Sequence, residues 1–319
     1  DDGTVDGIND SGKAIIGTGA GTVLRHDAWS GPGVIGVNGV TGILISQLKI
    51  LDSATSSYGI SFSTVTGSKV DKVWIEGGRP TVSYWGIGLF GGGNNTILNN
   101  FISMAQQLEI FRIGSSNNNT IFNNSFNGDI AISSSQQNIV SANQTGQIGL
   151  FVSNSNTVSS NCGSGIQLSK GTTSTNPQVE NNTVCGNNIY ATGGYDSVIS
   201  LTGANLNSIS GNNISGDASA VVDGIQFGQS SAFTNNYNIV AGNLVLEQKG
   251  HTWITTYNSN SCNLFSSNFL LCLDDGYSYQ NRQAIVLDSA DSVGNYIFGN
   301  LIDGFRLNIK DLGTNTKYT

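Results

Sequence analysis

Charge, proline and methionine are scarce in this chain of 319 residues, with 11% charged side chains, three prolines and one methionine. No apolar run reaches the roughly 18 residues that a membrane-spanning helix needs. Basic side chains number 13 against 21 acidic ones, and the net charge of -8 opposes binding to a phosphate backbone or an anionic bilayer. We therefore expect no nucleic-acid partner and no membrane insertion. The first ten residues are acidic where a signal peptide would be basic, so we expect a processed or excised chain.

Histidine and cysteine are also rare, with two and four copies. Neither forms a cluster with the spacing of a zinc site, so we expect no metal centre. The cysteines fall at different positions relative to the asparagine repeat described below, which places Cys162 and Cys185 roughly 10 Å apart along neighbouring repeats. Cys262 and Cys272 also occupy different positions, although a loop between them would allow a bridge. We interpret all four as buried free thiols.

Small polar residues are abundant, and the 42 glycines are spread evenly instead of gathering in a linker. Together with many β-branched residues and few charges, this composition is typical of a folded, strand-rich chain and not of a disordered one. We expect a single domain over residues 1–319, with an initial segment and first coil in residues 1–32 and regular coils in residues 33–316.

The clearest feature of the sequence is an internal repeat in which two asparagines stand five residues apart. The interval between copies varies from 17 to 30 residues while this spacing stays constant, so insertions should lie in loops and the strands should stay in register. We expect each asparagine to adopt the left-handed αL conformation at a corner, with its amide bonded to the same amide in the neighbouring coils. The nine pairs are Asn95/Asn100, Asn119/Asn124, Asn138/Asn143, Asn156/Asn161, Asn182/Asn187, Asn207/Asn212, Asn238/Asn243, Asn263/Asn268 and Asn295/Asn300.

A short segment that usually reads Gly-Ile-x-apolar precedes most copies, as at residues 59–62, 86–89 and 224–227. Alternation with period two indicates a strand with one inward face. These segments begin near residues 33, 59, 86, 109, 131, 149, 166, 196, 224, 254, 284 and 307. The repeat predicts an all-β fold, a right-handed parallel β-helix solenoid of about 12 coils.

Residues 17–24, Gly-Thr-Gly-Ala-Gly-Thr-Val-Leu, followed by coils such as Asn-Thr-Ile-Phe-Asn-Asn at residues 119–124, resemble the pectin-lyase-like β-helix superfamily. The resemblance covers about residues 14–316. Polysaccharide lyases, glycoside hydrolases, epimerases and phage tailspikes are frequent in this superfamily, so the resemblance implies a carbohydrate ligand. Neither histidine precedes a glycine, and Trp74-Ile75-Glu76 lacks a following basic residue, so no subfamily is implied.

The candidate site is the corner where the chain leaves the second asparagine and enters the next Gly-Ile strand, because the loops there lengthen in the second half of the sequence. Coils lie about 4.8 Å apart, so carboxylates on this corner would stand roughly 5 to 10 Å from one another, the range that glycosidases use. An ordinary solvated loop is the alternative, since Asp-Asp-Gly is a common turn. The predicted catalytic residues are Asp223, Glu247, Asp274, Asp275 and His251, and the predicted substrate-binding residues are Asp196, Lys249, Trp253, Tyr277, Tyr279 and Arg282.

A second group of aromatic and charged residues fits either a distal sugar subsite or a turn shielded by a tryptophan. This group comprises Glu76, Arg79, Tyr84 and Trp85, with Glu109 and Arg112 one coil further on.

We expect an extracellular protein, secreted or on a virion or cell surface, that binds a polysaccharide in a groove along coils 196–284 and cleaves it. A glycoside hydrolase is favoured over a lyase, because a lyase acting on an acidic polymer needs more basic residues than the 13 scattered here. The acidic loops favour a neutral or amino sugar. No cofactor is expected, and calcium would be needed only by a lyase.

Two other classes of function stay open. A non-catalytic glycan-binding or receptor-binding β-helix, such as a phage tailspike or a surface adhesin, would have the same repeat. A structural solenoid of a surface filament would also have few charges and a polar ladder. A secreted enzyme should be a monomer, whereas a tailspike should be a homotrimer.

Overall fold

A computed structural model of the chain shows parallel strands that return to the same three sheets turn after turn, and none of the described residues is helical. It describes residues 5–8, 10–19, 21–26, 34–52, 58–77, 85–104, 109–170, 178–191, 197–216, 223–228, 234–246, 252–257, 260–272, 283–305 and 307–318. The chain divides into two compact units, residues 1–149 and 150–319, with β18 (Gln147–Phe151) at the division. The expected single domain stays a prediction.

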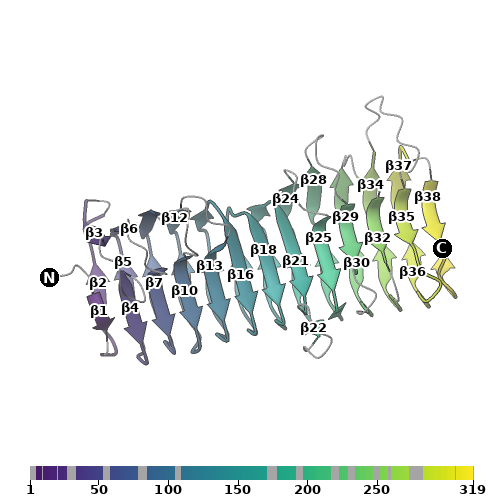
Figure 1. Cartoon of the computed structure of the whole chain (residues 1–319). Coiled ribbons are helices and arrows are strands. Elements are labelled where there is room, and N and C mark those ends of the chain that lie inside the picture. Colours follow the sequence, from purple (N-terminus) through teal and green to yellow (C-terminus); the bar gives the residue numbers. More distant parts are fainter. Residues whose placement is uncertain are drawn as a thin grey trace. The chain divides into compact units, whose positions relative to one another are not determined.

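In the first unit, each turn of the chain as far as β15 adds one strand to a first, a second and a third sheet, and the next turn adds strands only to the first and second sheets (Figure 1). The first sheet contains β1 (Val5–Ile8), β4 (Ile35–Asn38), β7 (Tyr58–Ser63), β10 (Trp85–Phe90), β13 (Glu109–Gly114) and β16 (Asp129–Ser133). The second contains β2 (Ala14–Ile16), β5 (Leu44–Ser46), β8 (Lys69–Asp71), β11 (Thr96–Leu98), β14 (Thr120–Phe122) and β17 (Ile139–Ser141). The third contains β3 (Val23–His26), β6 (Lys49–Asp52), β9 (Trp74–Gly77), β12 (Phe101–Met104) and β15 (Ser125–Phe126).

The second unit repeats the same order of sheets. Its first sheet contains β21 (Gly165–Ser169), β25 (Ser197–Thr202), β29 (Asp223–Phe227), β32 (Thr252–Thr256), β35 (Gln283–Leu287) and β38 (Leu307–Asp311). Its second contains β19 (Thr157–Ser159), β23 (Thr183–Cys185), β27 (Ser208–Ser210), β30 (Ile239–Ala241), β33 (Leu264–Ser266), β36 (Tyr296–Phe298) and β39 (Lys317–Tyr318). Its third contains β20 (Cys162–Gly163), β24 (Asn188–Ala191), β28 (Asn213–Gly216), β31 (Leu244–Leu246), β34 (Phe269–Leu271) and β37 (Leu301–Asp303), while β22 (Val179–Glu180) pairs with β26 (Ala204–Asn205).

This arrangement confirms the predicted parallel β-helix and its register. Ile225 pairs with Ile254 and Ile254 pairs with Ile285, so identical residues stack in the interior of the second unit. The side chains of these three isoleucines are fully buried. Stacks of this kind remove large aliphatic groups from water at every turn, at about 25 cal/mol per Å² of apolar surface.

The Gly-Ile motif has a steric origin at the start of the first-sheet strands. A Cβ atom added to Gly86 would lie 2.4 Å from Cγ2 of Ile102 in the third sheet, and one added to Gly59 would lie 2.9 Å from Cγ2 of Ile75. Both positions face the crowded interior, as does the isoleucine that follows, so only glycine fits. The residue before each glycine, Tyr58 or Trp85, therefore begins the strand on its outward side.

The paired asparagines form two buried hydrogen-bonded columns in each unit. Both the backbone N–H and the side-chain amide of Asn187 donate to Oδ1 of Asn212, at 3.0 and 2.9 Å. The Asn212 amide donates in turn to Oδ1 of Asn243 and to the carbonyl of Val184, at 2.9 and 3.1 Å. All nine predicted pairs belong to such columns, and almost every one of these side chains is buried. The predicted ladder is therefore confirmed.

The αL conformation lies one residue earlier than predicted. The residue before every paired asparagine has a positive φ, between 53° and 65°, whereas the asparagine itself does not. Side chains as large as Leu206 and Tyr237 occupy this αL position and stay exposed. The αL turn directs the side-chain amide of the following asparagine into the interior. One residue therefore has the strained backbone conformation, and the next residue forms the hydrogen bonds.

The cysteine prediction is correct in one part only. All four cysteines are free thiols, but only Cys272 is buried, while Cys162 and Cys262 are exposed and Cys185 is intermediate. Cys262 occupies an αL turn position, which explains its access to solvent, and Cys185 is the last residue of β23, between Ser159 and Ser210 of the neighbouring turns.

The asparagine column predicts that substitutions of two adjacent asparagines, Asn212 and Asn213, have very different effects on the free energy of unfolding. Replacing Asn212 with alanine removes the acceptor of the buried Asn187 backbone N–H and the amide that donates to Val184 and Asn243, which should destabilise the fold by on the order of 3 kcal/mol. Replacing the exposed Asn213 should change the free energy of unfolding by less than about 0.5 kcal/mol. Chemical denaturation of both variants measures the difference, and equal losses would contradict a supporting role for the ladder.

Candidate functional site

Most of the residues predicted for the loop-bearing corner lie outside the described part of the chain. Asp223 is described in full, and Trp253 is described only as part of the backbone of β32. The remaining predicted residues, outside the described ranges, are Asp196, Glu247, Lys249, His251, Asp274, Asp275, Tyr277, Tyr279 and Arg282.

The expectation that only coils 196–284 have long loops at this corner is wrong. In the first unit, residues 78–84 connect β9 to β10, and this connection is longer than the one formed by residues 217–222 between β28 and β29. The connections are shortest near the middle of the chain, where two residues separate β15 from β16 and one residue separates β20 from β21. Loop length alone therefore does not place the candidate site in the second unit. The side chains on the strands distinguish the two units.

Asp223 begins β29 on the outward side of the first sheet in the second unit. Ile225 and Phe227 of the same strand are fully buried, which places Gln226 on the outer face between them. Ile225 pairs with Ile254, so Trp253 enters the neighbouring strand directly beside this start of β29. The structure therefore brings together the backbone positions of two of the predicted site residues.

Tyr257, which follows β32, extends back to this carboxylate. Its Oη lies 3.5 Å from Oδ2 of Asp223, and Nε2 of Gln226 lies at the same distance from that oxygen. Asp223 and Gln226 are only 8% and 5% exposed, whereas Tyr257 is half-buried. The three side chains form a compact polar group on the outer face, which we call the Asp223 cluster.

The environment of Tyr257 keeps its phenol protonated. Burial, together with the negative charges of Asp223 and Asp288, raises its pKa to about 12, because ionising the phenol would place a charge in a poorly solvated position beside like charges. Tyr257 is therefore a hydrogen-bond donor at neutral pH and not a base.

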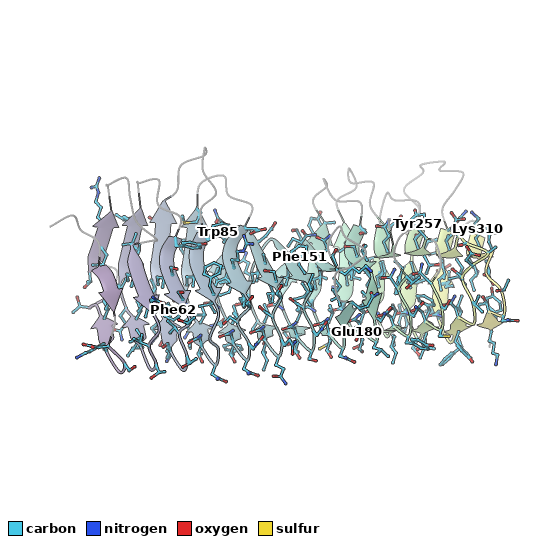
Figure 2. The ribbon with its side chains drawn as sticks, turned by 60° about the horizontal axis from the view of Figure 1, so that its bottom comes forward. Phe62, Trp85, Phe151, Glu180, Tyr257 and Lys310 are labelled. Carbon is cyan, nitrogen blue, oxygen red and sulfur yellow. The ribbon has the colours of Figure 1, made fainter. Side chains whose placement is uncertain are left out.

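A charged pair borders the Asp223 cluster on the next strands. Nζ of Lys310 lies 2.7 Å from Oδ1 of Asp288, and both side chains are about one third exposed. Figure 2 labels Tyr257 and Lys310 on the second unit. The ammonium of Lys310 is therefore held by Asp288 and not by the Asp223 cluster.

Two buried oxygens beside the cluster have no hydrogen-bond partner within the described residues. They are Oε1 of Gln226 and Oγ1 of Thr255, two residues that pair directly across β29 and β32. An unpaired buried polar group costs about 1 to 3 kcal/mol, so its persistence calls for an explanation such as a ligand or an ordered water.

Sequence reasoning missed Tyr257, Gln226, Thr255, Asp288 and Lys310 because it looked for the site in the loops. The strand pattern could have revealed Gln226 and Thr255, since both occupy the polar position between two inward apolar residues. The contact between Tyr257 and Asp223 joins residues 34 positions apart, and no local pattern indicates it.

The second predicted group does not form one site. Trp85 donates its indole N–H to Oε2 of Glu109 at 3.1 Å, and the Arg112 guanidinium lies 5.1 Å from the Trp85 ring centre. Tyr58 stacks at 5.0 Å from one coil earlier, so both faces of the Trp85 ring are covered and no sugar can stack on it. Glu76 instead bonds to Lys49 and Trp74 in the third sheet. Arg79 and Tyr84 lie outside the described residues.

Carboxylates also meet at the start of β13 and β16 in the first unit, where Glu109 pairs with Asp129. Burial raises the pKa of Asp129, although a backbone hydrogen bond from Gln147 opposes the effect, and the charge of Glu109 adds to the increase. No partnerless buried polar atom accompanies this pair within the described residues, unlike the Asp223 cluster.

The described residues contain no group of three or more histidine, cysteine or acidic side chains that could hold a metal ion. They also contain no helix of the length and hydrophobicity that a bilayer crossing requires.

No protein-family model and no curated protein sequence matches the chain. Solved structures do match. The A-module of the Azotobacter vinelandii mannuronan C-5 epimerase AlgE4 aligns with 97% of this chain and 91% of its own length, with a TM-score of 0.65 and 12% identity. The catalytic domain of the GH87 α-1,3-glucanase D1045A in complex with nigerose aligns with 98% of this chain and 63% of its own, with a TM-score of 0.56 and 14% identity. At these identities the likeness shows the fold, and the chain shares the parallel β-helix with both proteins.

Proposed function

We propose that the chain is an extracellular carbohydrate-active protein that binds a polysaccharide on the outer face of the first sheet in its second unit and hydrolyses it. The observation that carries the proposal is the Asp223 cluster, in which a carboxylate, a protonated phenol and two partnerless buried oxygens converge on one outward surface. Sugar hydroxyls are both donors and acceptors, and they would complement such a surface. The two solved structures above, an epimerase of mannuronan and a glucanase with bound nigerose, support a saccharide as the ligand.

Hydrolysis fits this surface better than elimination. A lyase needs an unprotonated base to remove a proton from carbon, but the Tyr257 phenol keeps its proton and the Lys310 ammonium is held by Asp288. A hydrolase needs a carboxylate that activates water or attacks the sugar, and Asp223 can supply it. The general acid would come from the neighbouring connections, where Glu247, Asp274 and Asp275 were predicted.

The same charges favour an uncharged substrate. Among the described side chains, this surface has the negative charges of Asp223 and Asp288 and the positive charge of Lys310, so a uronate polymer would be repelled from the Asp223 cluster. A neutral glycan would meet hydrogen-bonding groups without this penalty.

Replacing Asp223 with asparagine should lower the turnover of a cleaved glycan by roughly 100-fold to 10,000-fold, because the isosteric amide keeps the shape but cannot accept the proton. Release of reducing ends from a panel of neutral glycans measures this effect. Asp303→Asn, which changes an exposed carboxylate in the third sheet of the same unit, is the matched control.

An Asp223→Asn variant that retains most of its activity would show that Asp223 is not the catalytic carboxylate. Glycan binding by the unmodified protein without any release of reducing ends would favour the non-catalytic module. Light scattering on the 33.4 kDa chain would then distinguish a monomer from a trimer.

The pKa of Tyr257 gives a second test, which separates hydrolase from lyase. The folded-state pKa of about 12 exceeds the ordinary value of 10, so the proton is bound more tightly in the folded protein. This contribution to stability is fully present below pH 10 and is lost as the pH rises through about 12. The tyrosinate absorbance of the parent protein minus that of Tyr257→Phe should therefore appear only near pH 12. A difference signal that appears at or below pH 10 would make Tyr257 available as a base and favour a lyase.

A further inference from the structure

A separate concave surface lies in the first unit, at the corner between the second and third sheets. It is a hollow of about 220 Å³ lined by Leu48, Lys72, Val73, Trp74, Asn99 and Phe101. These residues come from three successive turns of the chain, and none of them belongs to the Asp223 cluster.

The hollow has an apolar wall because the asparagine column has not yet begun at this position. Leu48 and Val73 occupy the places that Asn100 and Asn124 take in later turns, and the backbone N–H of Val73 donates to Oδ1 of Asn100 at 2.9 Å. Lys72 and Asn99 precede these places in the αL conformation, with φ of 57° and 56°. The turn thus sets two polar side chains beside an aliphatic surface.

Two aromatic rings complete the wall. Trp74 and Phe101 pair across β9 and β12, and their ring centres lie 4.8 Å apart with the planes tilted by 57°. They are 39% and 38% exposed, more than most large apolar side chains in the described residues. Exposed rings beside polar groups are typical of surfaces that bind amphipathic ligands such as sugars, whose C–H faces pack on aromatic rings.

Among the described side chains around the hollow, one cation, Lys72, forms no ion pair. Lys49 pairs with Glu76 at 2.8 Å and also lies 5.1 Å from the centre of the Trp74 ring. Glu76 accepts the indole N–H of Trp74 at 2.6 Å, which fixes the ring. Lys69 pairs with Asp71 at 3.1 Å, and Asn99 donates to the same carboxylate at 3.0 Å. Lys72 forms no ion pair with the other described residues, although its charge acts on Asp71. The described side chains around the hollow therefore have a net positive charge, three lysines against two carboxylates, in a chain whose net charge is -8.

We propose that this hollow binds an acidic sugar residue of a polysaccharide, with the sugar packed against the solvent-exposed parts of Trp74 and Phe101 and its carboxylate at Lys72. The volume suits a single sugar ring and not an extended chain. The charge preference is opposite to that of the Asp223 cluster, so the hollow is a second glycan site, and it does not rest on the proposed hydrolysis.

Calorimetric titration of the full chain with a uronate oligosaccharide, oligogalacturonate, and with an uncharged one, cello-oligosaccharide, tests the proposal. Trp74→Ala should weaken oligogalacturonate binding by about tenfold or more. Lys72→Met should weaken it severalfold and remove most of its dependence on salt concentration. Asp223→Asn should leave this binding unchanged.

Trp85→Ala is the matched control, because Trp85 lies in the same unit and also has a carboxylate, a cation and a second ring around it. It should bind oligogalacturonate as the parent protein does. Trp74→Phe, which keeps an aromatic face, should retain most of the affinity and shows that the loss in Trp74→Ala is not a folding defect.

Three results would overturn the proposal. The first is no binding of oligogalacturonate by the parent protein, and the second is equal affinity for the uncharged oligosaccharide. The third is an equal loss in Trp74→Ala and Trp85→Ala. Failure of Asp223→Asn to lose turnover would affect only the proposed hydrolysis.

Discussion

The buried asparagine column fixes the length of one part of every turn. Each amide accepts two hydrogen bonds from the turn before it and donates to the turn after it, so a shift of one residue would leave several buried groups without partners. The second sheet and its two corners are therefore held at a constant length. Insertions can enter only at the other corners, beside the first sheet, and variable groups for chemistry gather there.

Because this constraint keeps the strands in register, equivalent residues on the outer face of the first sheet have a fixed spacing from one turn to the next. Parallel strands place equivalent residues about 4.8 Å apart, so a polar group on β29 always lies beside one on β32. The Asp223 cluster uses this spacing, with Gln226 beside Thr255 and Tyr257 reaching across to the aspartate. In the first unit the same positions hold Tyr58, Trp85 and Glu109, which satisfy one another and leave no ring face open.

The fold could be predicted closely because both of its signals are local and repeated. The five-residue asparagine spacing and the Gly-Ile motif located the columns and the first-sheet strands, since each depends on backbone geometry within a few residues. The αL residue was predicted one position too late in the chain, because the asparagine pattern marks the corner but does not indicate which of two neighbouring residues has the positive φ. The site could be predicted only in part, at Asp223. Contacts such as that between Tyr257 and Asp223 form between turns, and the repeat in the sequence does not determine how side chains of different turns pack. Exposure of Cys162 and Cys262 was missed for the same reason.

The hydrogen bonds between one asparagine of the column and the next all run in one direction along the chain. The earlier asparagine donates and the later one accepts, from Asn95 to Asn138 in the first unit and from Asn156 to Asn295 in the second. Amide dipoles aligned in this way add together and polarise one another, as the peptide dipoles of an α-helix do. Each unit therefore has an electrical polarity along its stack of turns, with the amide oxygen atoms facing the earlier turns and one N–H of each amide donating to the asparagine of the later turn, although the side chains that create it are uncharged.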